Sequence, residues 1–327
     1  MLRGSVFLKK HTEEKGMERA WARVLLCFLC SVGLVSAPRA AKGQGTADGQ
    51  SSHGREFWRQ IAKNHYAIPA GQEAFPLAKE LSGYLGLSDP ELRDDLAYSI
   101  LAVWIIRQKM FSTEELVTLL EEWQANLRVG IGETGTDSIF KRSFSALCLS
   151  ALAERDLKEP FLIDARFRTL LNAALTYLDV ERDLRGFDAK KGWIHATAHT
   201  ADLLAALAQN RFFTKQDQER VLKGVTQRLE TASEIFSYGE QDRLANVAAA
   251  IVSREDFDNE GWSAWVAQMD KEDRVVWNDS PPKMPALSRF QNDSYFLSAT
   301  AAQILLRPPS STSAEAQKSV LAVLRHR

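Results

Sequence analysis

Apolar residues recur every three or four positions through most of the chain after residue 54, the spacing that places them on one face of an α-helix. Clear examples are PELRDDLAYSILAVWIIRQKM, STEELVTLLEEWQANL, RFRTLLNAALTYLDV, GWIHATAHTADLLAALA, TKQDQERVLKGVTQRL and DSYFLSATAAQILL. No run shows the sustained apolar–polar alternation of a strand. The pattern therefore predicts an all-α fold of about a dozen helices, mostly about 10 to 20 residues long.

Residues that favour helix starts agree with this pattern. Ser112 is followed by Glu115 and Thr214 by Asp217, the spacing at which a hydroxyl and a carboxylate cap the first turn reciprocally. Pro90 stands where the longest apolar pattern begins, a position that suits proline.

The chain also resembles itself at long range. RQKMFSTEELVTLL and AQNRFFTKQDQERVL share a phenylalanine, Phe111 or Phe213, then a capping residue and an acid. Arg142 and Arg243 open two further similar segments, and ATAAQILLRPPSSTSAEAQKSVL is a weaker echo. A period near 100 residues fits two stacked helical hairpins of HEAT-like size. This predicts one α-solenoid domain over residues 54–327, with chance resemblance between amphipathic helices as the open alternative.

The N-terminal part has a different composition. Residues 1–16 are polar and unpatterned, after which Met17 opens MERAWARVLLCFLCSVGLVSAPRAAKG, with two arginines before the apolar run Val24–Val35. A basic start, a short apolar run and then small residues are typical of a secretory signal peptide. We predict such a signal within residues 1–40, with Met17 as a candidate start, and export to the periplasm or medium.

An uncleaved N-terminal anchor is the alternative, although the apolar run is shorter than the roughly 20 residues that a membrane helix needs. Residues 41–53, AKGQGTADGQSSH, are rich in Gly, Ser and Gln and are predicted to form a flexible linker. Beyond residue 40 the chain keeps one cysteine, Cys148, which excludes an internal disulfide there and suggests a buried thiol in its apolar run.

Charge narrows the classes of partner. The chain has 41 basic and 42 acidic residues and no basic block or stripe, so nucleic-acid binding has no electrostatic support. The expected ligand is a small molecule, peptide or protein on the concave face of the solenoid. Apart from an N-terminal anchor, no membrane contact is expected.

One stretch, GWIHATAHTADLL, holds candidate chemistry. On a helix, His195, His199 and Asp202 would share a stripe about 60° wide. Arg185, in the preceding loop, is placed to pair with Asp202 or to hold an anionic ligand. In EQDRLANV, Glu240 and Arg243 begin a later helix and are predicted to face the same surface.

Three interpretations of this stripe stay open. The H-x-x-x-H spacing lacks the glutamate of zinc peptidases, because position 196 is alanine. Two histidines and an aspartate still suffice for a divalent metal such as zinc with an open position. A metal-free ligand or acid/base site and a hydrogen-bonded structural network are the others. The first hypothesis is thus a non-enzymatic binding module, and the second a metal-dependent or acid/base hydrolase-type enzyme.

The stretch also carries a family resemblance. It reads as an Arg-Gly turn followed by GW-x-H-x-x-A-H-x-x-D, formed here by Arg185, Gly186, Gly192, Trp193, His195, Ala198, His199 and Asp202. This pattern resembles the DUF family numbered 2785, a bacterial family of uncharacterised helical proteins, over most of the chain from about residue 55. The resemblance implies a helical fold and the same site, and it implies no activity.

Overall fold

A computed structural model describes residues 53–327. The predicted signal peptide and all of the predicted linker except His53 lie outside the described residues. The first described α-helices are α2 (Arg55–Lys63), α3 (Ala74–Tyr84), α4 (Ser99–Ala102), α5 (Thr113–Asn126), α6 (Ser138–Lys158) and α7 (Asp164–Val180). They are followed by α8 (Ala196–Leu207), α9 (Lys215–Glu230), α10 (Glu240–Val252), α11 (Asn259–Asp273), α12 (Met284–Leu305) and α13 (Ser311–Leu324).

The fold of these residues is all-α, as predicted, with twelve α-helices packed against one another. Two wider π-type helical segments, η2 (Glu91–Tyr98) and η3 (Val103–Arg107), flank α4, and a short 3-10 turn, η4 (Arg274–Asn278), follows α11. Among residues 53–327 the β-structure is one antiparallel hairpin, formed by β1 (Phe187–Asp188) and β2 (Gly192–Trp193), each two residues long.

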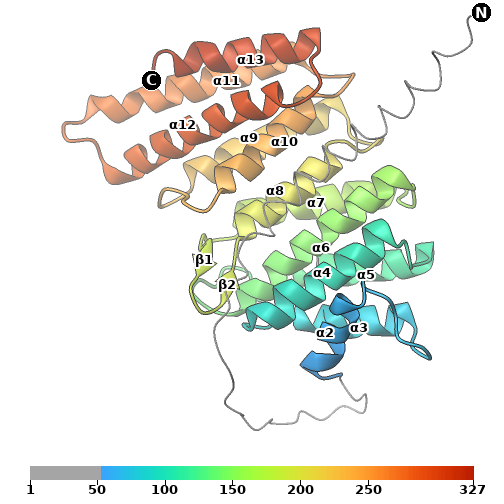
Figure 1. Cartoon of the computed structure of the whole chain (residues 1–327). Helices are drawn as coiled ribbons and strands as arrows, with labels where there is room; N and C mark the ends of the chain where they lie inside the picture. The colour runs from blue at the N-terminus through green and yellow to red at the C-terminus, as the bar shows by residue number, and fades with distance from the viewer. Residues whose placement is uncertain (1–52) are drawn as a thin grey trace, which may run out of the picture. The chain divides into compact units, whose positions relative to one another are not determined.

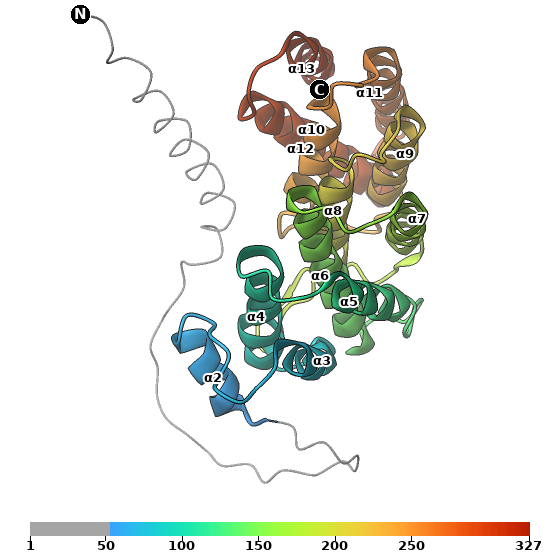
Figure 2. The same cartoon turned by 90° about the vertical axis from the view of Figure 1, so that its right-hand side faces the viewer.

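The helices from α5 to α12 alternate between two layers (Figures 1 and 2). In one layer α8 packs between α6 and α10, and α10 packs against α12. In the other layer α7 packs on α9, and α9 contacts α11 (Figure 2). We call α6, α8, α10 and α12, with the segment η2–α4–η3 that packs on α6, the inner helices.

The helix starts expected from capping residues are confirmed. Ser112 with Glu115 begins α5, and Thr214 with Asp217 begins α9, each through a complete reciprocal capping box. Phe111 and Phe213 are both buried in the position before the cap. Pro90 directly precedes η2, as its position in the pattern predicts.

The core runs the length of the described domain. Its largest side chains include the tryptophans at positions 58, 104, 123 and 262, all fully buried. Cys148 on α6 is free and buried, which confirms its predicted place, and burial raises the pKa of its thiol. No helix of residues 53–327 combines the length and apolar character needed to cross a bilayer.

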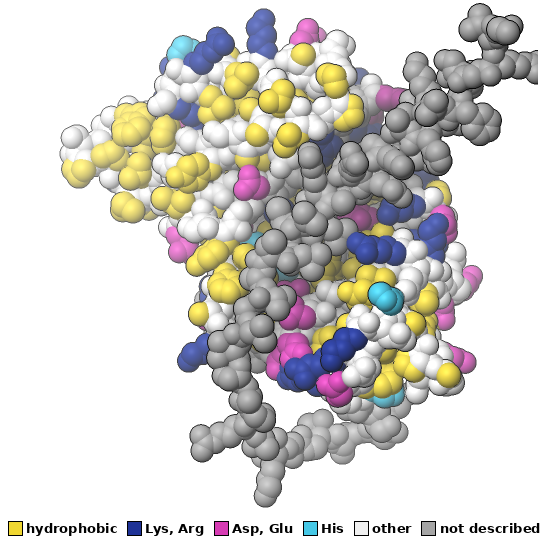
Figure 3. All heavy atoms as spheres, viewed as in Figure 1, with side chains coloured by type: hydrophobic (Ala, Val, Ile, Leu, Met, Phe, Trp, Pro, Cys, Tyr) yellow, Lys and Arg dark blue, Asp and Glu magenta, His cyan; other side chains and the backbone are white. Residues whose placement is uncertain are grey.

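Some apolar side chains lie on the surface instead. Figure 3 shows hydrophobic side chains gathered at the projecting end where α11 and α12 meet, the left-hand end of this pair in Figure 1.

Candidate functional site

The predicted site begins with the β1–β2 hairpin between α7 and α8. Asp188 shapes its turn, because one carboxylate oxygen accepts the backbone N–H groups of Lys190 and Lys191, each at 2.8 Å. Gly192 has φ +73°, and a Cβ there would lie 2.9 Å from Cβ of Pro90. Glycine therefore allows both the backbone conformation and the close packing of the hairpin on the start of η2.

Arg93, on η2, holds the hairpin in place through hydrogen bonds to its backbone. Its guanidinium is fully buried and donates to the carbonyl oxygens of Leu87 and Lys191, at 2.7 and 2.6 Å. The same group lies over the rings of Phe140 and Phe144 on α6. Burial lowers the pKa of Arg93 to about 10, so the group stays charged at neutral pH. The hairpin is thus anchored by a cation whose partners are carbonyls and aromatic faces.

His195 lies outside the helix in which the sequence placed it. Helix α8 begins at Ala196, and His195 is the residue before it, with a left-handed φ of +52°. The predicted stripe of three residues on one helix is therefore wrong for His195. Its ring stacks on Trp193, with centroids 4.6 Å apart.

The tautomer of His195 follows from its partner. Nε2 lies 2.9 Å from the carbonyl oxygen of Tyr238, which can only accept, so Nε2 carries the proton. Desolvation lowers the pKa of this imidazole to about 4, and the ring is neutral at physiological pH.

His199, one turn into α8, is held by α6. The hydroxyl of Ser143 donates to the carbonyl of Ile194 and therefore accepts from Nδ1 of His199, at 2.8 Å. The imidazole also contacts Phe144 edge-on, with centroids 5.0 Å apart. Burial lowers the pKa of His199 well below its ordinary value. Both histidines are thus neutral and oriented by hydrogen bonds.

Asp202 has a partner of its own. Its carboxylate accepts from Nη1 of Arg243 on α10 at 2.6 Å. Burial raises the pKa of Asp202, and Arg243 opposes this effect. The predicted pairing of Asp202 with Arg185 is wrong. Arg185 donates through Nε and Nη2 to the carboxylate of Asp183, and also to the carbonyl oxygen of Thr136. A carboxylate two residues away in the loop satisfies that guanidinium locally.

Glu240 joins the site from the start of α10. One carboxylate oxygen lies 3.5 Å from Nε2 of His195, and the other accepts the backbone N–H of Tyr238 at 2.9 Å. Burial raises the pKa of this carboxyl group. A Cβ on Gly186 would lie 2.7 Å from the first oxygen and inside the contact distance of the Tyr238 ring, so glycine permits this approach. Glu240 and Arg243 therefore reach His195 and Asp202 from the start of α10.

The geometry does not gather a metal-binding set. Within residues 53–327, no three His, Cys, Asp or Glu side chains are grouped so that they could hold a metal ion. His195, His199 and Asp202 are directed at a carbonyl, a hydroxyl and a guanidinium respectively. The arrangement is a network of satisfied hydrogen bonds that joins α6, α8 and α10.

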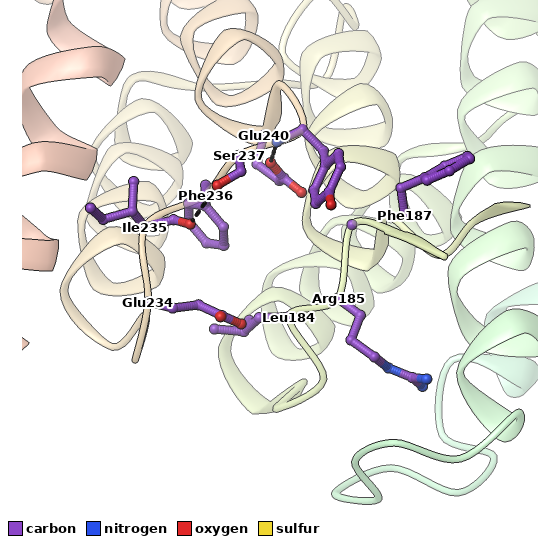
Figure 4. A pocket seen from close by; sticks show the side chains of 10 residues that line it. Leu184, Arg185, Phe187, Glu234, Ile235, Phe236, Ser237 and Glu240 are labelled. Atoms are coloured by element: carbon purple, nitrogen blue, oxygen red, sulfur yellow. Dashed lines mark hydrogen bonds between the residues drawn. The ribbon is translucent and has the colours of Figure 1, made fainter. Parts of the chain in front are cut away.

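Two hollows lie beside this network, and residues 235–237 of the segment that joins α9 and α10 line both. The first, of about 190 Å³, is lined by residues 184–187 and by Glu234–Tyr238 and Glu240 (Figure 4). Figure 4 shows the side chain of Arg185 directed away from the others. The second, of about 540 Å³, reaches Asp242 on α10 and Tyr295 on α12.

Sequence reasoning missed the segment 234–238, because it has no helical periodicity. It lies within ASEIFSYGE, residues 232–240, in which an isoleucine and two aromatics precede Gly239, whose φ is +89°. Tyr238 and Ile235 are 48% and 38% exposed, and Phe187 across the first hollow is 42% exposed. An apolar residue and two aromatics directly ahead of a glycine, outside any helical pattern, are the sequence signal that could have marked this loop.

Comparison with known proteins identifies a family over the part of the chain that holds this network. A family model described as a protein of unknown function (DUF2785) matches residues 127–301, which include the whole hairpin and α8 to α11. This confirms the resemblance carried by the GW-x-H-x-x-A-H-x-x-D pattern, over a shorter range than predicted. No curated protein and no solved structure matches the chain.

Proposed function

The chain belongs to the DUF2785 family of proteins of unknown function, and we propose that it is an exported helical-repeat protein that binds a ligand beside its inner helices. Export rests on the two arginines and the apolar run that precede residue 36. The ligand site that we assign is the pair of hollows along residues 234–238.

The positions of the helices support a solenoid of stacked hairpins. Helices α5, α7, α9, α11 and α13 begin at residues 113, 164, 215, 259 and 311, about 50 residues apart, the size of one helical hairpin of the HEAT type. An inner helix lies between each successive pair. Four inner helical segments carry an arginine within their first two turns, at positions 93, 142, 243 and 289, and α8 carries His199 there.

The observation that carries the binding proposal is the set of exposed apolar side chains around the two hollows. Phe187, Ile235, Tyr238 and Tyr295 are all more than a third exposed and lie on three different elements. The rings of Tyr238 and Tyr295 are rigid and amphipathic, so they supply contact area at low entropic cost. Asn292 on α12 and Glu240 on α10 hold the segment 234–238 in place, because they accept the backbone N–H groups of Phe236 and Tyr238.

The charges beside these side chains favour a cationic ligand. Glu234 and Asp242 are exposed at the two hollows, whereas Arg185, the basic residue of the first hollow, is neutralised by Asp183. Carboxylates next to aromatic faces attract ammonium and guanidinium groups. We therefore assign the site to a short peptide in which Lys or Arg stands beside an apolar residue.

The enzymatic alternative has weaker support. His195 and His199 are 5% and 3% exposed, and the hydroxyl of Ser143 donates a hydrogen bond to the carbonyl oxygen of Ile194. A general base needs to reach a substrate proton, and these groups already use their hydrogen bonds within the protein. Glu240 is the acid that lines a hollow with a raised pKa, so it would be the residue to test first if hydrolysis were observed.

The test is fluorescence anisotropy with labelled peptides that contain Arg–Phe or Lys–Tyr pairs, compared with the same peptides carrying Glu in place of the basic residue. Only the basic peptides are expected to bind. Tyr238→Ala and Glu234→Gln should each weaken binding about tenfold, the loss of one good contact. Ile163→Ala, at the start of α7, removes a side chain that is 54% exposed elsewhere and should change nothing. Equal binding of acidic and basic peptides, or no binding at all, contradicts the proposal.

A further inference from the structure

A second surface stands apart from the hollows, at the turn between α11 and α12. We call residues 274–285 the apolar tip. Val275, Trp277 and Met284 are 56%, 61% and 67% exposed, whereas Val276 between the first two is buried. Pro281 and Pro285 are exposed as well. Figure 3 shows hydrophobic side chains concentrated at the projecting end of the molecule, where α11 and α12 meet.

The tip is held in place by the helices behind it. The ring of Trp277 packs edge-on against Phe290 of α12, with centroids 5.3 Å apart. Arg289 on α12 donates to Glu272 of α11 at 2.6 Å and pairs with Glu230 of α9 at 3.2 Å. The outward orientation of Trp277 is therefore supported by packing on one edge of its ring, while the remainder faces solvent.

Basic residues surround the tip. The exposed charged residues between positions 271 and 285 are Lys271, Arg274, Asp279 and Lys283, three basic and one acidic. Arg274 and Lys283 form ion pairs with Asp270 and Asp279, yet their side chains remain 65% and 76% exposed. The chain as a whole has a net charge of −1, so this basic collar is a local feature. It is complementary to a negatively charged surface.

We propose that the apolar tip docks on a membrane surface that contains anionic phospholipid, with Trp277 at the level of the headgroups. Tryptophan is enriched at this depth because its ring is apolar and its N–H can stay hydrated. Lys271, Arg274 and Lys283 then face the lipid phosphates, and Val275 and Met284 enter the acyl boundary. This contact is separate from an uncleaved N-terminal anchor, the alternative to a signal peptide and the one membrane contact that the sequence pattern allowed for.

A lipid surface fits this tip better than a second protein does. A stable protein interface uses roughly 20 to 30 residues on each side. The tip offers five exposed apolar side chains on one narrow turn, which is too few for such an interface. A bilayer needs no matching shape, so a small apolar protrusion with a basic collar is sufficient for reversible binding.

The experiment measures co-flotation of the whole chain with vesicles, made either of phosphatidylcholine alone or of equal parts phosphatidylcholine and phosphatidylglycerol. The protein should float with the anionic vesicles. Trp277→Ser with Met284→Ser should reduce the partition coefficient about tenfold or more, and Lys271→Glu with Lys283→Glu should remove the preference for anionic lipid.

The matched control is Leu305→Ser with Leu306→Ser. These side chains are 72% and 79% exposed at the far end of the same helix, about 30 Å from the tip. They should leave flotation unchanged, and circular dichroism checks that every variant is folded. Brominated lipid should quench the tryptophan fluorescence of the wild type more than that of Trp277→Phe. Because the chain has several tryptophans, this difference assigns the contact to Trp277.

Absence of flotation, or equal flotation of the wild type and the Trp277/Met284 variant, overturns the proposal. An effect of the Leu305/Leu306 variant equal to that of the tip variant does so too, because general surface hydrophobicity would then suffice. Dimerisation without lipid that the tip variant abolishes would instead assign the tip to a second copy of the chain.

Discussion

The cluster at the start of α8 and the cluster where α11, α12 and the C-terminus meet both bury ionisable side chains, but they satisfy them differently. In the first, each histidine has a directional hydrogen bond, to a carbonyl or a hydroxyl. In the second, both carboxylate oxygens of Asp293, one of Asp273 and Nε of Arg289 have no hydrogen-bond partner. Nε of Arg93 is the corresponding exception beside the first cluster.

The difference lies in the type of group. Neutral imidazoles can donate to backbone carbonyls without a large desolvation penalty, so the α8 cluster holds no unpaired charge at the histidines. At the other cluster two buried carboxylates face each other, and both burial and the charge of Asp273 raise the pKa of Asp293. A proton on Asp293 allows it to donate to Asp273, as in other carboxyl pairs that share one proton. The first cluster is therefore specified by geometry and the second by charge balance.

The largest expected effect concerns the ion pair that supports the first cluster. Arg142 on α6 donates to Glu181, just before the hairpin, at 2.7 Å, and both side chains are buried. Arg142→Met leaves a buried carboxylate without its cation and should lower the free energy of unfolding by about 3 to 5 kcal/mol. Urea denaturation measures this. Arg128→Met, at an exposed position, should cost less than about 0.5 kcal/mol. Similar costs for the two variants would show that the pair does not hold the loop.

The second prediction is a pH dependence with a definite sign. The pKa of His195 is lowered to about 4 in the folded protein, from an ordinary value near 6.5. As the pH falls, His195 in the unfolded chain therefore binds a proton before His195 in the folded protein does. The contribution of the neutral imidazole to the free energy of unfolding is complete above pH 6.5 and is lost as the pH falls through 4. The loss is on the order of 3 kcal/mol.

Urea denaturation between pH 7 and pH 4 checks it. His195→Asn keeps a residue that tolerates the left-handed backbone and should flatten the acid side of the profile. An unchanged profile in His195→Asn would mean that His195 titrates normally.

The third prediction separates a structural histidine from a metal ligand. His199→Ala leaves the buried hydroxyl of Ser143 without its donor and should lower the free energy of unfolding by about 1 to 3 kcal/mol. Ser143→Ala, combined with it, should cost less than the sum of the two single variants, because they remove one shared bond. The zinc content of purified protein, measured by elemental analysis, should be the same with and without His199. Zinc that is bound by the wild type and lost in His199→Ala would restore the metal interpretation.

Features fixed by neighbouring residues were predictable, and those fixed by distant residues were not. The capping boxes of α5 and α9 depend on residues three positions apart, and both were predicted from the sequence. The helix start after His195 depends on Gly192 packing on Pro90 and on Arg93, which bonds to Lys191 across 98 positions. Helical periodicity carries no information about such a contact, so it placed His195 inside the helix that begins at Ala196.

The partner of Arg185 illustrates a second limit. Helical spacing placed Asp202 where Arg185 was expected to reach it. Asp183, however, lies two residues before Arg185 and accepts hydrogen bonds from Nε and Nη2 of its guanidinium. The loop 234–238 illustrates a third limit, because helical periodicity does not detect irregular segments that neighbouring helices hold in place. In each case tertiary context decided between contacts that the sequence allowed.

The smallest expected effect tests the second cluster. Because the folded pKa of Asp293 is raised, its contribution to stability is complete below the ordinary aspartate value near 4 and is lost as the pH rises. Asp293→Asn keeps a neutral side chain of similar shape and can still donate to Asp273. At pH 8 it should be more stable than the wild type by about 1 kcal/mol, with the difference shrinking towards pH 4. Thermal unfolding at the two pH values measures this, with Asp279→Asn on the exposed tip as the control. If Asp293→Asn destabilised the protein equally at both pH values, Asp293 would be an ordinary ionised partner of Arg289. The contrast between a cluster set by geometry and one set by charge balance would then be lost.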